Sequence, residues 1–248
     1  MNVYFHINYE PDKSKVLSRI DERIKSGKPG YICVADGNIL TMVHRDQEYR
    51  KVIQGSMFSI VDSSWVPVLV RRLYGQTWQQ YCGSQIFDDI TKMRKYRIYF
   101  LGAKQDVLDA LKVRMTEIDS AIGEMKFVEL PFCSVEDFNY EDIAVAINND
   151  APDIIWLSLG APKQEIFASK LTPLLNRGVV IPVGAVFNFR PGLGIRRAPQ
   201  WMVKCHIEFV WRIFSEPRKQ ILRCWNIIRT LPAIYKEEKN DSIDCKNI

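Results

Sequence analysis

The sequence predicts an α/β protein with a Rossmann-like, open and mostly parallel sheet, helices on both of its faces, and a C-terminal α-helical appendage. Short, nearly continuous apolar runs rich in β-branched residues alternate with longer amphipathic stretches, which is typical of parallel strands covered on both faces. After residues 191–194 the chain becomes basic, aromatic and helical in pattern. We therefore expect a catalytic domain over residues 1–195 and an appendage over residues 196–248.

The predicted elements follow in chain order. Six apolar runs are expected to be strands: residues 31–35, 57–61, 97–101, 126–130, 153–159 and 179–183. Helix-length stretches occupy residues 39–54, 64–74, 83–94, 106–121, 135–149 and 162–176. Pro162 suits a helix start, because a proline in the first turn gives up no needed N–H. In the appendage, residues 199–214 and 216–231 are expected to be helical, and the polar tail from Lys236 is expected to fray.

Composition excludes several classes of protein. The chain has 248 residues, 47% of them apolar and 11% aromatic, which excludes a disordered protein. No stretch reaches the roughly 18–20 uninterrupted apolar residues of a membrane-spanning helix. The start of the chain lacks a secretory signal pattern, and the six cysteines show no Cys-x-x-Cys spacing. We therefore expect a cytoplasmic protein with reduced thiols and no metal site.

The net charge of +5 is concentrated in one segment. Residues 196–229 carry eight Lys or Arg and two Glu, whereas residues 1–195 carry 23 basic and 23 acidic side chains. Large apolar residues such as Trp211 and Trp225 are interleaved with these charges. The pattern favours an interfacial helix pair on an anionic membrane. The alternatives are a core face with a solvated charged face, and nucleic-acid binding, which the lack of a readout motif disfavours.

Ligands of open α/β sheets bind beyond the carboxyl ends of the strands. Gly102 follows the run 97–101 and opens a turn whose N–H groups suit a phosphate, unless it is only a turn. The run 153–159 is followed by Gly160, Ala161, Pro162, Lys163, Gln164 and Glu165. A lysine at a helix start opposes the helix dipole, so we expect an anion there, such as the diphosphate of a nucleotide sugar. The alternative is a capped helix with a solvated face.

Two further segments end predicted strands with polar residues. Asn188 and Arg190 alternate with aromatic residues after the run 179–183, and they line either a base or sugar pocket or an edge strand. Asp62 ends the run 57–61, where partial burial suits a general base. On spacing alone, a cap for the helix that begins near Ser64 is the favoured interpretation of Asp62.

The remaining residues of types common in active sites match no known nucleotide-binding or metal-binding motif. Neither a G-x-G-x-x-G motif nor a P-loop is present, and the three histidines lack metal-like spacing. His44 is expected on the surface of a helix. Cys133 has no base nearby in the sequence and is expected to be buried rather than nucleophilic.

Several motifs together resemble the WecG/TagA/CpsF family, glycosyltransferase family 26. Residues 160–165 (Gly-Ala-Pro-Lys-Gln-Glu), preceded by Pro-Asp-Ile-Ile at 152–155, resemble the family signature. Residues 196–202 resemble its basic Ala-Pro-x-Trp-Met stretch, and residues 208–212 and 216–218 resemble its closing elements. Residues 44–50, 83–84 and 100–102 match earlier segments of the family pattern in the same order. The resemblance runs from about residue 34 to residue 223.

The resemblance implies an inverting enzyme that needs neither a metal nor another cofactor. Its donor would be a UDP-sugar and its acceptor a polyprenyl-diphosphate-linked saccharide of bacterial surface-polysaccharide synthesis, at the cytoplasmic face of the membrane. The family's catalytic aspartate corresponds to Asp62, which becomes the expected general base. The expected substrate-binding residues are Asp36, Gly83, Ser84, Gly102, Gly160, Ala161, Lys163, Gln164, Glu165, Asn188, Arg190, Arg212, Arg218 and Arg223.

This chain departs from the family pattern near the expected sugar and diphosphate. Val34 and Asp36 replace the threonine and the asparagine of the family's Thr-x-Asn. Gln80 replaces an arginine, Gln85 replaces an acid, and Asn188 replaces the aspartate of Phe-Asp-Phe. The alternative function is therefore a nucleotide-sugar-binding module with weakened or lost catalysis. The sequence leaves open whether the protein is a monomer or a homo-oligomer.

Overall fold

The computed structural model describes residues 3–189 and 217–244, without the side chains of residues 189, 217–220 and 241–244. Its main sheet has five strands, all parallel, in the order β3 (Gly30–Tyr31), β9 (Val179–Pro182), β8 (Ile154–Ser158), β6 (Ile98–Gly102) and β7 (Lys126–Val128). Each strand falls within or overlaps a predicted run. The predicted Rossmann-like α/β fold is confirmed.

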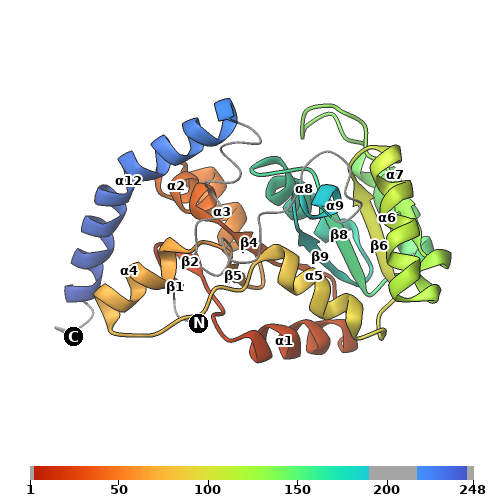
Figure 1. Ribbon diagram of the computed structural model, residues 1–248, viewed down its shortest axis with the longest axis horizontal. Coiled ribbons are helices and arrows are strands. Elements are labelled where there is room, and N and C mark those ends of the chain that lie inside the picture. Colours follow the sequence, from red (N-terminus) through yellow and green to blue (C-terminus); the bar gives the residue numbers. More distant parts are fainter. Residues whose placement is uncertain (1–2, 190–216, 245–248) are drawn as a thin grey trace.

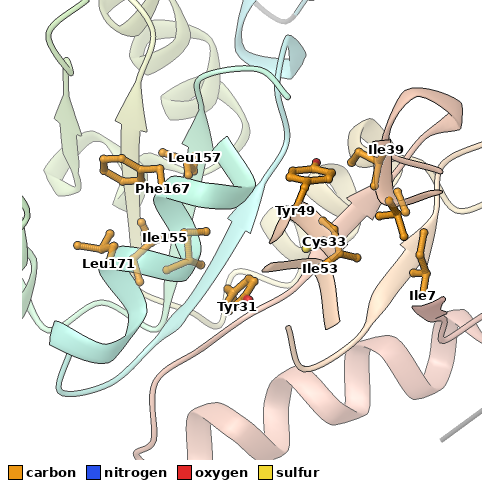
Figure 2. Packing of buried hydrophobic residues seen from close by; sticks show 14 of the residues in the cluster. Ile7, Tyr31, Cys33, Ile39, Tyr49, Ile53, Ile155, Leu157, Phe167 and Leu171 are labelled. Carbon is orange, nitrogen blue, oxygen red and sulfur yellow. The ribbon is translucent and has the colours of Figure 1, made fainter. Parts of the chain in front are cut away.

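Helices cover both faces of this sheet, as expected. On one face α7 (Tyr140–Asp150) and α8 (Lys163–Leu171) pack on Ile155 and Leu157 of β8 (Figure 2). On the other face α1 (Lys13–Lys25), α5 (Gly83–Lys92) and α6 (Gln105–Ile118) pack on Ile154 and Trp156. Successive strand residues point to opposite faces, so a continuous apolar run fills both cores.

The predicted strand 31–35 is two short strands with different partners. The Ile32 N–H donates to the Val180 carbonyl (3.1 Å), whereas the Cys33 N–H donates to the Phe58 carbonyl (3.1 Å). The chain thus leaves β9 after β3 and continues as β4 (Cys33–Ala35), which pairs in parallel with β5 (Ser59–Val61). The carboxyl ends of β4 and β5 are thereby brought to the same edge as those of the main sheet.

Several element boundaries differ from the prediction. The helix expected over residues 39–54 is divided into α2 (Gly37–Arg45) and α3 (Gln47–Gln54), because Asp46 accepts hydrogen bonds from the Glu48 and Tyr49 N–H groups and caps α3. The hairpin of β1 (Val3–Tyr4) and β2 (Ile7–Asn8) and helix α1 were not predicted. The last turn expected in residues 162–176 is a 3₁₀ helix, Thr172–Leu174.

The C-terminal helix α12 (Pro217–Asp244) lies beside α2 and α4 (Trp65–Tyr74), away from β6 and β7 (Figure 1). It continues the predicted helix 216–231 through the tail that was expected to fray. The other predicted helix, 199–214, and the domain boundary after residue 195 lie outside the described residues. Within the described residues, no helix has the length and apolarity needed to cross a membrane.

Two carboxylates hold the end of α12 in place. Glu238 accepts hydrogen bonds from the Phe5 N–H (2.7 Å) and the Tyr74 hydroxyl (2.6 Å). Glu237 binds His6 Nε2 (2.8 Å) and His44 Nδ1 (2.6 Å). These contacts explain why the polar tail stays helical. His44, expected on the surface, is partly covered, with its side chain 23% exposed.

We expect Glu238→Ala to lower the free energy of unfolding by about 1–3 kcal/mol, because the Phe5 N–H and the Tyr74 hydroxyl would lose a buried acceptor. Urea denaturation followed by circular dichroism measures the change. Lys236→Ala, on the same helix but exposed, is the control and should change stability by less than about 0.5 kcal/mol. Equal stability of the two variants would show that the Glu238 contacts do not anchor α12.

Candidate active site

The candidate site lies at the carboxyl edge of the strands, where ligands of open α/β sheets bind. Strands β4, β5, β8 and β9 run parallel, so the residues that follow them meet at one edge. Asp36 follows β4, Asp62 follows β5, Gly160 follows β8 and Gly184 follows β9. The residues that the sequence singled out therefore converge on one region.

Asp62 is half-buried and held by neighbouring backbone. Its N–H donates to the Ala35 carbonyl (3.2 Å), and its Oδ1 accepts from the Gly83 N–H (3.1 Å) at the start of α5. Gln80 Nε2 donates to the Asp62 carbonyl (2.6 Å). The interpretation of Asp62 as the cap of α4 is wrong, because Ser63 Oγ accepts the Trp65 N–H of that helix (3.2 Å) while Asp62 binds α5.

Gly83 connects Asp62 to the end of β9. A Cβ at Gly83 would lie 3.3 Å from Val34 Cγ1 and 3.8 Å from the Val183 carbonyl oxygen. The start of α5 therefore sits between the ends of β4 and β9. Ser84 follows in the first turn of α5, with its hydroxyl 3.2 Å from Cys82 Sγ.

The turn from Gly160 to Glu165 folds inward. Gln164 Oε1 accepts the Gly160 N–H (3.1 Å), and Gln164 Nε2 donates to Glu165 Oε1 (2.7 Å). Both side chains are buried, Glu165 completely. The alternative of a helix with a solvated face is therefore wrong at these two positions. Ala161 and Pro162, joined by a cis peptide bond, complete the turn.

Lys163 is held by the loop after β7. Its ammonium donates to the Cys133 carbonyl and lies 4.7 Å from the centre of the Phe138 ring, a cation–π distance. Cys133 itself is half-buried, less covered than expected. The structure thus supplies Lys163 with protein partners, and its contact with an anion stays a prediction.

Gly102 and Gly184 bring β6 and β9 against β8. Gly102 has a φ of +93°, and a Cβ there would lie 2.5 Å from the Ser158 carbonyl oxygen. The Ser158 hydroxyl donates to the Gly184 carbonyl (2.6 Å). Asn188 lies in the short helix α9 (Val186–Phe189), so the edge-strand interpretation is wrong for residues 186–189. Ser158 was not singled out in the sequence.

Asp36 connects the sheet edge to α12. Its Oδ1 accepts the Asn38 and Ile39 N–H groups (both 2.9 Å) as the cap of α2, and its Oδ2 forms an ion pair with Arg223 Nη2 (3.0 Å). One expected arginine thus reaches the carboxyl edge. Of the others, Arg190 and Arg212 lie outside the described residues, and only the backbone of Arg218, in α12, is described.

Burial dominates the electrostatics beneath the turn. Loss of hydration raises the pKa of Glu165 to about 7, and the nearby charge of Asp36 adds to the shift. Burial also raises the pKa values of the Tyr49 hydroxyl and the Cys33 thiol. Among the described residues, no three His, Cys, Asp or Glu lie close enough together to hold a metal ion.

A cavity of about 650 Å³ lies at the opposite edge of the sheet, near the amino ends of β3 and β5. Its lining includes Arg19, Arg23 and Tyr31 and none of the residues named above at the carboxyl edge. Parallel α/β sheets bind their substrates at the carboxyl edge, so this cavity is not the candidate active site.

The fold is Rossmann-like, and its carboxyl edge gathers the motif residues described above. The chain belongs to the glycosyl transferase WecG/TagA/CpsF family, whose sequence profile matches residues 4–243. The resemblance stated from the motifs is confirmed.

Named relatives agree with the family. The chain is 27% identical to an N-acetylglucosaminyldiphosphoundecaprenol N-acetyl-beta-D-mannosaminyltransferase of Bacillus subtilis, over 79% of this chain and 75% of the relative. It is 25% identical to a protein of the same name from Bacillus spizizenii, over 87% and 82% of the two chains. A Staphylococcus aureus protein of that name is 22% identical, over 75% and 72%.

Proposed function

We propose that this protein transfers a sugar from a UDP-sugar to a saccharide carried on a polyprenyl diphosphate, with inversion at the anomeric carbon. The names of the relatives support an N-acetylmannosaminyl donor and an N-acetylglucosaminyl-diphosphoundecaprenol acceptor. Their beta linkage also supports inversion, because the sugar of a UDP-hexose donor is ordinarily alpha-linked. A role in bacterial surface-polysaccharide synthesis is part of the proposal.

The observation that carries the proposal is the placement of Asp62. Its carboxylate stands at the carboxyl edge, fixed by the Gly83 N–H, on the same edge as the Gly160 turn. As general base, Asp62 would take the proton of the acceptor hydroxyl while that oxygen attacks the anomeric carbon. The electron pair of the broken C–O bond would leave with the diphosphate of UDP.

The leaving diphosphate fits the start of α8. The dipole of this helix favours an anion at its N-terminus, while the Gln164 N–H there already donates to the Gly160 carbonyl (3.0 Å). Arg223, which lies against Asp36, is the described cation of α12 that reaches this edge. The diphosphate would compete with Asp36 for Arg223. Asp36, which replaces the asparagine of the family motif, would therefore alter the affinity for the acceptor or the donor.

The direct test is UDP release from UDP-N-acetylmannosamine with a short-chain N-acetylglucosaminyl-diphosphate lipid. We expect turnover and a beta-linked product, identified by its one-bond C1–H1 coupling in NMR. UDP binding without turnover, across a panel of UDP-sugars and acceptors, would instead establish the nucleotide-sugar-binding module. Failure to bind UDP would reject both.

We also propose that α12 contacts the membrane that carries the acceptor. Four large apolar side chains on this helix are 56–63% exposed and share one side of it: Ile221, Leu222, Trp225 and Ile228. Such a face, next to basic residues, suits the headgroup region of an anionic bilayer.

We expect Trp225→Glu to reduce binding to phosphatidylglycerol vesicles at least several-fold, because it places a carboxylate in the apolar face and repels anionic lipid. Vesicle sedimentation measures the bound fraction. Val113→Glu, on α6 and 66% exposed, is the matched control and should bind like the parent protein. Equal loss in both variants would mean that overall charge, rather than the α12 face, determines binding.

A further inference from the structure

Glu165 is a completely buried carboxyl directly beneath the candidate diphosphate turn. Its Oε2 accepts from the Tyr49 hydroxyl (3.1 Å) and its Oε1 from Gln164 Nε2 (2.7 Å). Within the described part of the chain, no Lys, Arg or His forms an ion pair with it. Burying a carboxylate without a cation costs free energy, so the presence of Glu165 at this position calls for an explanation.

Among the residues that the structure describes, the groups around Glu165 offer no compensating positive charge. Tyr49 of α3 donates to Glu165, and Cys33 of β4 and Asp36, the cap of α2, lie close enough to interact with it electrostatically. Burial keeps the tyrosine and the thiol neutral near pH 7, and the negative Asp36 opposes a second negative charge. With its pKa at about 7, Glu165 stands near the midpoint of its titration at neutral pH.

Gln164 connects this carboxyl to the turn. Its amide donates to Glu165 through Nε2 and accepts the Gly160 N–H through Oε1 (3.1 Å). The hydrogen bond to Glu165 therefore determines which end of the amide faces Gly160. A Cβ built on Gly184 would lie 3.6 Å from the same Oε1, so the amide lies next to the end of β9.

We propose that Glu165 is a positioning residue that takes up a proton when the diphosphate of the nucleotide binds at the Gly160 turn, and that gives the proton back when UDP leaves. This inference rests on the proposed function, which places the diphosphate there. The diphosphate would add negative charge near Glu165, separated from it only by the side chain of Gln164. A nearby like charge favours the neutral form of a carboxyl. Protonation keeps the carbonyl oxygen as an acceptor for Gln164, so the turn stays ordered.

The sign of the pH dependence follows. The nucleotide-bound state holds more protons than the free state, so affinity falls as pH rises through the pKa of free Glu165 toward that of the complex. The fall is at most about tenfold per pH unit for one coupled proton. Between about pH 6 and pH 8 the wild-type protein should therefore lose affinity for UDP.

Calorimetric titration of the full chain with UDP, at about pH 7 in buffers of different ionisation enthalpy, measures the proton uptake. Glu165→Gln keeps an oxygen acceptor for Gln164 but cannot ionise, so we expect less uptake than in the wild type and a flatter affinity between pH 6 and pH 8. The proton linkage of UDP itself is common to both proteins and cancels in the difference. Circular dichroism checks that the variant folds.

Tyr49→Phe gives a second readout that does not depend on the Glu165 variant. Loss of its hydroxyl removes a hydrogen bond that favours the ionised carboxyl, so the pH at which affinity falls should move upward. Equal uptake in wild type and Glu165→Gln, or an unmoved profile in Tyr49→Phe, would overturn this inference alone. A wild-type protein that fails to bind UDP would overturn the proposed function, and this inference with it.

Discussion

Asp62→Asn should lower kcat for UDP release by about 10²–10⁴-fold, the usual contribution of a general base. Asparagine retains an oxygen that can accept the Gly83 N–H, so the start of α5 should stay in place. What is lost is the group that takes the proton of the acceptor hydroxyl. The binding of UDP should therefore change little while turnover falls.

Initial rates at saturating donor and acceptor measure this effect, with UDP affinity measured separately by calorimetry. Asp12→Asn is a matched control, because Asp12 also accepts N–H groups at a helix start, those of Ser14 and Lys15 in α1. It should keep full activity. A nearly unchanged kcat in Asp62→Asn would refute the assignment of the base, whereas equal losses in both variants would show that helix capping is responsible.

The sheet could be predicted from sequence because its strands are buried on both faces. Continuous apolar runs mark such strands, and all six predicted runs contain strand residues of the structure. The change of partner at Ile32 could not be predicted, because residues 31–35 form one unbroken apolar run. Only the hydrogen bonds to Val180 and Phe58, far along the chain, divide it.

Long-range contacts also explain the errors at both ends of the chain. The segment from Lys236 is polar, and local pattern predicts fraying, but Glu238 binds Phe5 across 233 residues. The hairpin strands have two residues each and are too short to show a periodic pattern. Helix α1 does carry a local signal, because Val16, Ile20 and Ile24 recur at helical spacing after the capping Asp12. Tertiary contacts therefore decide the structure where local preference is weak.

Part of the candidate site could be predicted from the sequence, for the same reason as the sheet. Residues that follow buried strands reach the carboxyl edge, so Asp62 and Gly160 could be placed from the strand pattern and the family motifs. The burial of Glu165 could not, since its partner Tyr49 is 116 residues away and lies on a different helix. A hydrophilic triplet such as Lys163, Gln164 and Glu165 gives no local sign that two of its members point inward.

Gly102→Ala should destabilise the protein by about 2–5 kcal/mol. The new Cβ would lie 2.5 Å from the backbone oxygen of Ser158, and forced overpacking costs about 1–3 kcal/mol. The φ of +93° adds about 1–2 kcal/mol of strain for a residue with a Cβ. Because β6 and β8 are neighbours in the centre of the sheet, the clash cannot be relieved by moving one side chain.

This prediction separates the two interpretations of Gly102. If the glycine served only to expose N–H groups to a phosphate, alanine would impair nucleotide binding and destabilise the protein by no more than the strain of its φ, about 1–2 kcal/mol. In the structure, close packing against the Ser158 oxygen requires a glycine at position 102 even without a ligand. The Ala103 N–H donates to the same oxygen (3.1 Å). Gly75→Ala is the control: its φ is +70° with open space around it, so only about 1–2 kcal/mol of strain is expected. Similar losses in the two variants would mean that β6 can move away from Ser158, and that backbone conformation alone selects glycine after this strand.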